Sequence, residues 1–358
     1  MRAAAAYMEW AKSRPRPRID LAGSNLLACT LDDLPGARDA VDVAGESPEG
    51  YPPLVDRIAR AYGVDPASVA TAGGCSGANF LALAGMLEAD DEVLVESPFY
   101  DPIPAAARML GARVAYFPRR FEDGFDVDPG LVASALTRRT RLLVLTNPHN
   151  PSGTLISPDR LRELIRLAER HGFTILFDEV YRDVVVDPER RPATAATLSP
   201  ACVSTSSLTK AYGLASLRCG WVLAQEELAR KIRRSRDVVD VWSPIPSDRL
   251  SVIAFDRLDA LAARARALVE TNLGRVTTWL AGQPRLECAA PRATLAFPRI
   301  RGVDDAAPFA DRLFRRTGVA VAPGHFFGAP AHFRIAFGGE PAKVSEGLER
   351  IGEELKEG

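Results

Sequence analysis

Short apolar runs that alternate with helical patterns, from about residue 91 onward, constrain the fold of this chain most strongly. These runs are rich in Val, Leu and Ile and lack alternating polar residues, which is typical of strands buried on both faces of a sheet. The predicted strands are residues 92–96, 113–117, 141–146, 173–177, 202–206 and 220–224.

A helix is predicted between the third and the fourth of these strands. Ser157 suits the N-cap, Pro158 suits the first helical position, and Gly172 suits the position that ends the helix. Its apolar stripe consists of Leu161, Leu164, Ile165 and Ala168. The order of strand, helix and strand predicts an α/β fold with a large, doubly wound and mostly parallel sheet.

The pattern changes after Pro244 and Pro246. A long helical stretch is predicted from about 247 to 280, with an interruption near Gly274. The predicted elements after it are short strands at 285–288, 295–297 and 333–337 and helices at 304–317 and 341–355. We therefore expect three regions: an N-terminal arm that joins the small domain (1–45), a large α/β domain (46–245) and a smaller α+β domain (246–358).

Composition supports an ordinary globular protein. The 358 residues suit two domains better than one. With 47% hydrophobic residues and a formal net charge of −1, nothing electrostatic points to nucleic acid or a membrane surface as a partner. The basic run at 230–236 fits the solvated face of a helix, and no apolar stretch is long enough for a signal peptide or a transmembrane span.

The cysteines indicate a reducing compartment. They lie far apart, form no C-x-x-C pair and are odd in number, so we interpret them as free thiols in a cytoplasmic protein. They are Cys29, Cys75, Cys202, Cys219 and Cys288. The histidines show no metal-ligand spacing, so we expect no metal site.

Polar residues follow three of the predicted strands where each strand ends. Asn147 and Asn150 follow one strand, Asp178 follows the next, and Ser207 and Lys210 follow a third. Ligands of open α/β sheets bind beyond the carboxyl ends of the strands. The sequence therefore predicts a site where an amide, an acid and a lysine meet.

The segments that carry these residues resemble the signature segments of class I/II aminotransferases, which are fold type I, aspartate-aminotransferase-like enzymes. The segments are Thr146-Asn-Pro-His-Asn-Pro-Ser-Gly153, Asp178-Glu-Val-Tyr181 and Ser206-Ser-Leu-Thr-Lys-Ala-Tyr-Gly213, the last followed by Arg218. Their order and spacing match, and the resemblance extends from the segment around Tyr51 to the segment around Arg334.

This resemblance implies that pyridoxal 5'-phosphate is the cofactor. Lys210 resembles the lysine that condenses with the cofactor aldehyde as a Schiff base, which requires an unprotonated amine. Asp178 resembles the carboxylate that pairs with the pyridine nitrogen and keeps the ring protonated. Tyr181 and Asn150 resemble the pair that donates hydrogen bonds to the phenolic oxygen of the ring.

The resemblance also implies a phosphate-binding cup. Gly74, Cys75 and Ser76 lie at the start of a predicted helix, where free backbone N–H groups favour an anion. Ser207 and Arg218 resemble the side chains that complete the cup, and the Arg218 guanidinium suits bidentate phosphate binding.

Further roles follow from the same resemblance. Tyr100 resembles the aromatic residue that stacks on the cofactor ring, with Phe99 as the competing candidate. Tyr51 resembles the tyrosine that crosses to the phosphate of another subunit, which implies a homodimer with shared active sites. Arg334 resembles the arginine that binds the substrate α-carboxylate, and Gly23 is expected to add a backbone contact to that carboxylate.

The implied reaction moves an amino group between an L-amino acid and a 2-oxo acid. Two alternatives stay open: another reaction on the same cofactor (a lyase, decarboxylase or cyclase), because the cofactor does not set the outcome, and a cofactor-binding sensor domain.

The sequence says little about the substrate. Family members specific for dicarboxylates often carry an arginine four residues before a serine like Ser243, where this chain has Val239. This disfavours aspartate and glutamate through that contact and favours an apolar or aromatic side chain. His149 lies beside the predicted site, but we expect no catalytic role for it because this segment commonly varies at that position.

Overall fold

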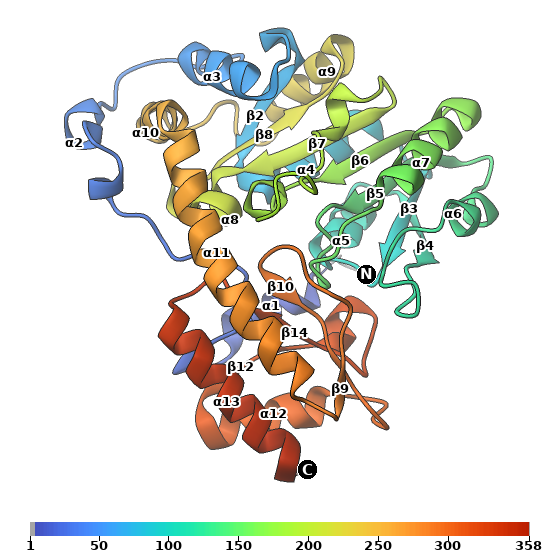
Figure 1. Cartoon of the computed structure of the whole chain (residues 1–358). Helices are drawn as coiled ribbons and strands as arrows, with labels where there is room; N and C mark the ends of the chain where they lie inside the picture. Colours follow the sequence, from blue (N-terminus) through green and yellow to red (C-terminus); the bar gives the residue numbers. More distant parts are fainter. Residues whose placement is uncertain (1–3, 358) are drawn as a thin grey trace.

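A seven-stranded sheet forms the centre of the larger part of the computed structural model, which describes residues 4–357 (Figure 1). Its strands lie in the order β2-β8-β7-β6-β5-β3-β4. The bounds are β2 Val69–Gly73, β3 Glu92–Ser97, β4 Arg113–Pro118, β5 Thr140–Thr146, β6 Thr174–Asp178, β7 Cys202–Ser207 and β8 Cys219–Leu223. β3 to β7 pair in parallel, and β8 runs antiparallel to β2 and β7. The predicted mostly parallel sheet is confirmed.

The predicted strands all form, to within one residue at each end. β2 was not predicted, because three of the five residues in its sequence Val-Ala-Thr-Ala-Gly are Ala or Gly, which are depleted in strands. The elements around β2 in the fold, and not its own sequence, account for its burial. β2 pairs with β8 along its whole length and packs under α4 (Gly74–Met86) and α9 (Glu226–Arg236).

Helices cover both faces of the sheet, as a doubly wound fold requires. On one face, α4, α5 (Pro102–Met109) and α9 pack on side chains of β3, β5 and β8. On the other face, α6 (Pro129–Ala135) and α7 (Pro158–His171) pack on β3, β5 and β6. The prediction for α7 is confirmed, and it ends at Gly172, whose φ of 71° favours glycine.

The smaller part combines both ends of the chain. β1 (Ile19–Asp20) of the N-terminal arm pairs with β12 (Val319–Ala320) near the C-terminus. The remaining strands are β9 Leu286–Glu287, β10 Leu295–Ala296, β11 Arg299–Ile300, β13 Ala322–Pro323 and β14 Phe333–Ala336. The remaining helices of this part are α1 Ala6–Ser13, α12 Ala307–Thr317 and α13 Pro341–Glu357. The arm therefore packs with the C-terminal part, while the expected boundaries at 45 and 245 stay a proposal.

The long helical stretch is interrupted at a different residue from the one predicted. α10 (Ile245–Asp256) ends at Arg257, and α11 (Leu258–Ala281) continues through Gly274 without a break. The predicted interruption at Gly274 is wrong. An interior glycine costs a helix only about 1 kcal/mol, and burial of Ala265, Val269 and Val276 along α11 offsets this cost. α11 runs from the larger to the smaller part (Figure 1).

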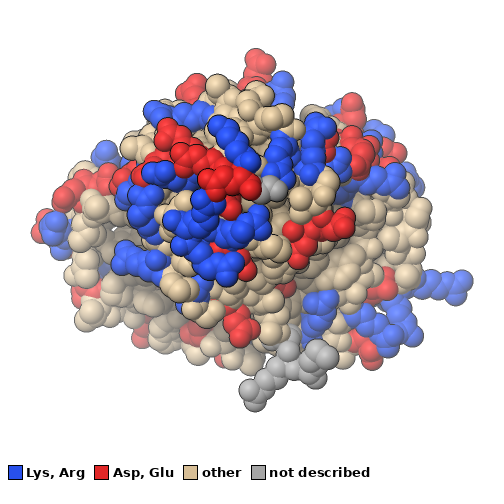
Figure 2. Space-filling model, turned by 90° about the horizontal axis from the view of Figure 1, so that it is seen from below, with Lys and Arg blue, Asp and Glu red and all other residues tan. Residues whose placement is uncertain are grey.

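The lower face of the molecule in Figure 1 carries basic and acidic side chains next to one another (Figure 2). Between α12 and α13, the Glu354 carboxylate forms ion pairs with Arg312 Nε at 3.2 Å and with Arg316 Nη1 at 3.0 Å. Within residues 4–357 no helix is both long enough and apolar enough to span a bilayer.

Three further α-helices complete the described chain: α2 (Ala37–Ala40), α3 (Pro52–Tyr62) and α8 (Leu208–Tyr212).

Trp221→Ala tests the packing under β8. Trp221 is 1% exposed and contacts the rings of Tyr62 and Phe255. We expect the variant to lose about 3–5 kcal/mol of unfolding free energy in urea denaturation, because a large cavity replaces the indole. Met109→Ala, at a position that is 64% exposed, should stay within about 0.5 kcal/mol of the wild type. A loss below about 1 kcal/mol for Trp221→Ala would contradict this packing.

Candidate active site

A cavity of about 420 Å³ opens at the carboxyl ends of β5, β6 and β7, where the sequence predicted a site. Ten of the predicted site residues line it: Gly23, Cys75, Ser76, Tyr100, Asn150, Asp178, Tyr181, Ser207, Lys210 and Arg218. Gly74 and Arg334 lie directly behind lining residues, as described below, and Tyr51 does not line it.

Lys210 reaches the cavity from α8, immediately after β7. Its Nζ donates to Ser24 Oγ at 3.0 Å and to Asn25 Oδ1 at 2.7 Å. Burial and, to a smaller extent, the positive charge of Arg334 lower the pKa of the Lys210 amine to about 7, although Asp178 opposes the shift. A large share of this amine is therefore unprotonated near neutral pH, as a nucleophile or a general base must be.

Asp178 ends β6 and is buried. Its carboxylate accepts from Asn79 Nδ2 at 2.8 Å, from Val180 N at 3.1 Å and from Cys75 Sγ at 3.3 Å. Thr205 in turn donates to Asn79 Oδ1. Burial raises the pKa of Asp178, and the hydrogen bond from Asn79 is the largest effect in the opposite direction. Because its protein partners are neutral donors, this acid suits a cationic ring nitrogen as an additional partner.

The start of α4 forms a cradle against Arg218. Gly74 has a φ of +77°, and a Cβ there would lie 2.3 Å from Arg218 Nη2. Arg218 also has a positive φ, of 49°, and its Nη2 donates to Gly73 O at 2.9 Å. Thr209, which lines the cavity, has a buried Oγ1 without a hydrogen-bond partner. Backbone N–H groups, hydroxyls and a guanidinium together fit a phosphate group.

Arg334 lies on β14 and is fully buried. Its Nη1 donates to Asn150 Oδ1 at 2.8 Å, and its Nη2 donates to Ala22 O at 2.7 Å and to the hydroxyl of Tyr7. Because Asn150 Oδ1 faces this guanidinium, its Nδ2 is left to donate into the cavity. Arg334 Nε is buried without a partner. One guanidinium thus joins β14, the N-terminal arm and the turn after β5.

Comparison with known proteins agrees with this geometry. A family described as aminotransferase class I and II matches residues 44–351. The chain belongs to this family. It is 34% identical to capreomycidine synthase of Streptomyces vinaceus over 289 residues, which cover 80% of this chain and 74% of the relative. It is 30% identical to arginine–pyruvate transaminase AruH of Pseudomonas aeruginosa over 346 residues, which cover 92% of this chain and 84% of the relative.

Solved structures extend the match over the whole fold. A PLP-dependent aminotransferase from Streptococcus suis superposes with a TM-score of 0.93 at 25% identity, covering 100% of this chain and 99% of that one. The PLP-dependent cyclase OrfR gives a TM-score of 0.89 at 27% identity, covering 99% and 97%. This class I and II aminotransferase is therefore a pyridoxal-phosphate enzyme that transfers amino groups between amino acids and 2-oxo acids, as the resemblance predicted.

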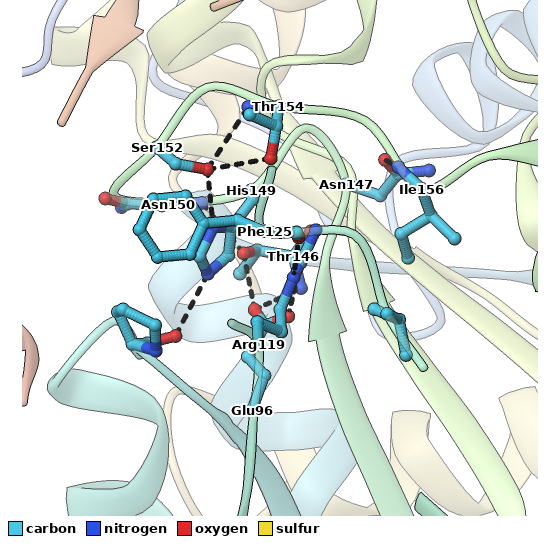
Figure 3. A network of polar contacts seen from close by, with 12 residues as sticks. Glu96, Arg119, Phe125, Thr146, Asn147, His149, Asn150, Ser152, Thr154 and Ile156 are labelled. Atoms are coloured by element: carbon cyan, nitrogen blue, oxygen red, sulfur yellow. Dashed lines mark hydrogen bonds and ion pairs between the residues drawn. The ribbon is translucent and has the colours of Figure 1, made fainter. Parts of the chain in front are cut away.

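In this aminotransferase a buried network supports the turn that carries Asn150 (Figure 3). The Glu96 carboxylate accepts from Arg119 Nη1 at 2.7 Å and from the N–H and the hydroxyl of Thr146 at 2.7 and 2.6 Å. Thr146 Oγ1 then accepts from Asn150 N at 2.9 Å. A buried ion pair persists when its remaining hydrogen-bonding groups are satisfied, and here those bonds fix the backbone of Asn150.

His149 belongs to this support and does not line the cavity. One ring nitrogen pairs with Ser152 Oγ at 2.7 Å and the other with Pro98 O at 3.0 Å (Figure 3). Burial lowers the pKa of His149 well below its usual value. A neutral imidazole with both nitrogens engaged has a structural role here.

Of the two predicted cavity tyrosines, Tyr181 is buried and Tyr100 is half-buried, and desolvation raises the pKa of each well above its usual value. Tyr181 and Tyr100 are therefore protonated donors at neutral pH. Phe99, the competing candidate for the stacking role, does not line the cavity and packs on Tyr116 instead.

Two predicted residues need separate comment: Gly23, which lines the cavity, and Tyr51, which does not. The N–H of Gly23 donates to Asp20 Oδ1 at 2.9 Å, so this donor already has a partner. Tyr51 precedes α3 as its N-cap residue. Their expected roles stay predictions.

Sequence reasoning missed several residues that build the site. Tyr7, Met8 and Ala11 of α1 line the cavity, as does Thr209, and Asn79 holds Asp178. Asn79 lies four residues after Cys75, on the same face of a helix, and that spacing was its available signal. The sequence of α1 contains no pattern that predicts its contact with the cavity, because the tertiary fold of the N-terminal arm brings α1 to this place.

Gly74→Ala tests the cradle. A Cβ at this position would strain a positive φ and displace the Arg218 guanidinium, so we expect cofactor affinity to fall at least tenfold in an absorbance titration of the cofactor-free protein. Gly73→Ala is the matched control, because Gly73 has a φ of −72° and open space around its Cβ position. Equal losses in both variants would contradict the cradle.

Competitive acetylation tests the lowered pKa of Lys210. Only the free amine reacts, so labelling of Lys210 in the cofactor-free protein should rise with pH through about 7. Peptide mass spectrometry reads the label, with the exposed Lys356 as an internal reference. Arg334→Gln should move the midpoint upward, because it removes a positive charge. A wild-type midpoint near 10 would contradict the structure.

Proposed function

We propose that this enzyme transaminates an L-amino acid with an apolar or aromatic side chain. The support is the cavity wall. Tyr7, Met8 and Ala11 of α1 line the cavity, and within the described lining the only arginine is Arg218 and the only acid is Asp178. A dicarboxylate side chain would therefore find no second arginine in the described lining, where Lys210 is the other cation. Val239, where an arginine would select dicarboxylates, is 56% exposed.

Each polar group of the cavity has a proposed task. Pyridoxal phosphate, when bound, supplies an aldehyde that takes up amino groups and a ring that withdraws electrons from the substrate Cα. Lys210 would bind the aldehyde carbon covalently and, once freed, its Nζ would accept the Cα proton. Asp178 would hold a proton on the ring nitrogen, and the pair Tyr181 and Asn150 would donate to the ring oxygen.

The remaining residues would bind the cofactor phosphate, the cofactor ring and the substrate carboxylate. Arg218, Ser76 and Ser207, with the N–H groups at Gly74 and Cys75, would hold the phosphate. Tyr100 would stack on the ring, while Arg334 and Gly23 would bind the substrate carboxylate. Gly74 and Cys75 begin α4, and Arg334 lies on β14, so secondary structure would orient these donors before the substrate arrives.

We further propose a cytoplasmic homodimer with shared active sites, in which Tyr51 reaches the partner's phosphate. Large apolar side chains are exposed together in two segments, which suits a protein interface. They are Leu27, Leu31, Val41 and Val43 in one segment and Val238, Val239, Val241 and Trp242 in the other. All five cysteines are free thiols, which fits a reducing compartment.

A second candidate function is cyclisation of an amino acid on the same cofactor. The specific support is the 34% identity to a protein named capreomycidine synthase and the structural match to a cyclase. Lys210 and Asp178 would serve that reaction equally, since both reactions begin with loss of the Cα proton.

A panel of amino donors separates the two candidates. Transamination converts the bound cofactor to its amine form, and a 2-oxo acid reverses the spectral change, whereas cyclisation returns the cofactor unchanged. We expect phenylalanine or leucine to cause this conversion, with L-arginine included because one relative is an arginine–pyruvate transaminase. A product with altered mass and no cofactor conversion would favour the cyclase.

Lys210→Ala tests the assignment of the amine. We expect turnover to fall by about 10⁴-fold, because the proton-transfer group is lost, and borohydride to leave the cofactor unattached. Lys231→Ala, on the surface of α9, is the control. Wild-type turnover in Lys210→Ala would overturn the assignment.

A further inference from the structure

A second cavity, of about 910 Å³, lies outside the active site. It is bounded by residues 154–158, the first half of α7, residues 189–198 and residues 290–292. We call it the arginine-rimmed cavity. Its volume lies within the range of about 300–1,000 Å³ that is usual for sites of small organic ligands.

The wall of the arginine-rimmed cavity is apolar. Leu155, Ile156, Pro158, Leu161, Ile165 and Leu198 form much of its surface. Leu198 is 45% exposed, so apolar area remains in contact with water at this site. Removing such area from water would favour a ligand with an apolar body.

The charged groups around this wall are almost all positive. The lining includes five arginines, at 162, 166, 190, 191 and 292, and one acid, Glu189. Arg162 and Arg190 pair with Asp159 and Asp187 on the surface. The remaining three arginines take part in no ion pair or side-chain hydrogen bond within residues 4–357.

Two of these three unpaired arginines are half-buried. Arg191 has a buried Nε without a partner, and burial together with the nearby charge of Arg266 lowers its pKa. Arg292 is held through its backbone, whose N–H donates to Gly153 O at 2.9 Å. An uncompensated guanidinium beside apolar surface is a strong site for a carboxylate or sulfonate.

The arginine-rimmed cavity shares a structural segment with the active site. Thr154 and Ile156 line it, and both belong to the network behind Asn150 (Figure 3). The N–H of Ile156 donates to Asn147 Oδ1 at 3.1 Å. Residues 290–292 come from the part of the chain that also carries Arg334, so the cavity is formed by both parts of the molecule.

We propose that the arginine-rimmed cavity binds an amphipathic organic anion, with its acidic group at Arg191 and Arg292 and its apolar body on the wall around Leu161. This site is separate from the substrate cavity, and its occupancy does not depend on the reaction that the enzyme performs.

The test uses the holoenzyme and the fluorescent aromatic sulfonate 8-anilinonaphthalene-1-sulfonate. We expect saturable binding that octanoate displaces and octan-1-ol does not, because the alcohol has the apolar chain without the charge. Arg191→Gln combined with Arg292→Gln should weaken binding of the probe at least tenfold. Arg315→Gln should leave binding of the probe unchanged, because Arg315 is an exposed arginine of α12 that forms no ion pair or side-chain hydrogen bond among residues 4–357.

A second variant guards against misfolding of the first. Leu161→Glu places an acid on a half-buried wall position of α7, and it should also abolish displacement by octanoate while cofactor absorbance stays at the wild-type level. Equal displacement by octanoate and octan-1-ol, or wild-type binding in the double arginine variant, would overturn the proposal.

Discussion

Parallel pairing of β5, β6 and β7 is the constraint on which the rest of the active site depends. In the register of these strands Thr146 pairs with Asp178, and Asp178 pairs with Thr205, so β5 and β6 end level and β7 continues to Ser207. The residues that follow each strand therefore enter one cavity from one edge. A shift of one residue in this register would turn Asp178 to the opposite face of the sheet.

The electrostatics of the cavity follow from burial of groups that lack charged partners at close range. Burial lowers the pKa of Lys210 to about 7 and raises that of Asp178. Neutral donors and acceptors hold both groups: Asn79 orients the acid, and Ser24 and Asn25 orient the amine. A cationic ring with an aldehyde and a phosphate supplies the interactions that this arrangement leaves open, which is why the residues fit the cofactor of the family.

Arg334 connects the two parts of the molecule behind the cavity. The guanidinium stacks between the rings of Tyr7 and Phe327, at 4.9 and 4.8 Å from their centroids, and reaches Asn150 on the larger part. The Glu96–Arg119 pair fixes Asn150 from the other side through Thr146. Asn150 is thus positioned by two arginines from distant segments, which gives the amide one orientation.

The sequence by itself determined the strands, α7 and the residues at the strand ends, because continuous apolar runs and helix-ending glycines act locally and leave a readable pattern. It also determined the family, through the segments that carry Lys210 and Asp178. The tertiary structure decided that β2 is a strand, that α11 passes through Gly274 without a break, and that α1 lines the cavity beside Asn150. These features depend on distant partners: β2 takes its place from pairing with β8, and α1 from the path of the arm across β12. A local sequence pattern cannot predict such partners, because β2 and α1 are stabilised by contacts with residues far away in the chain.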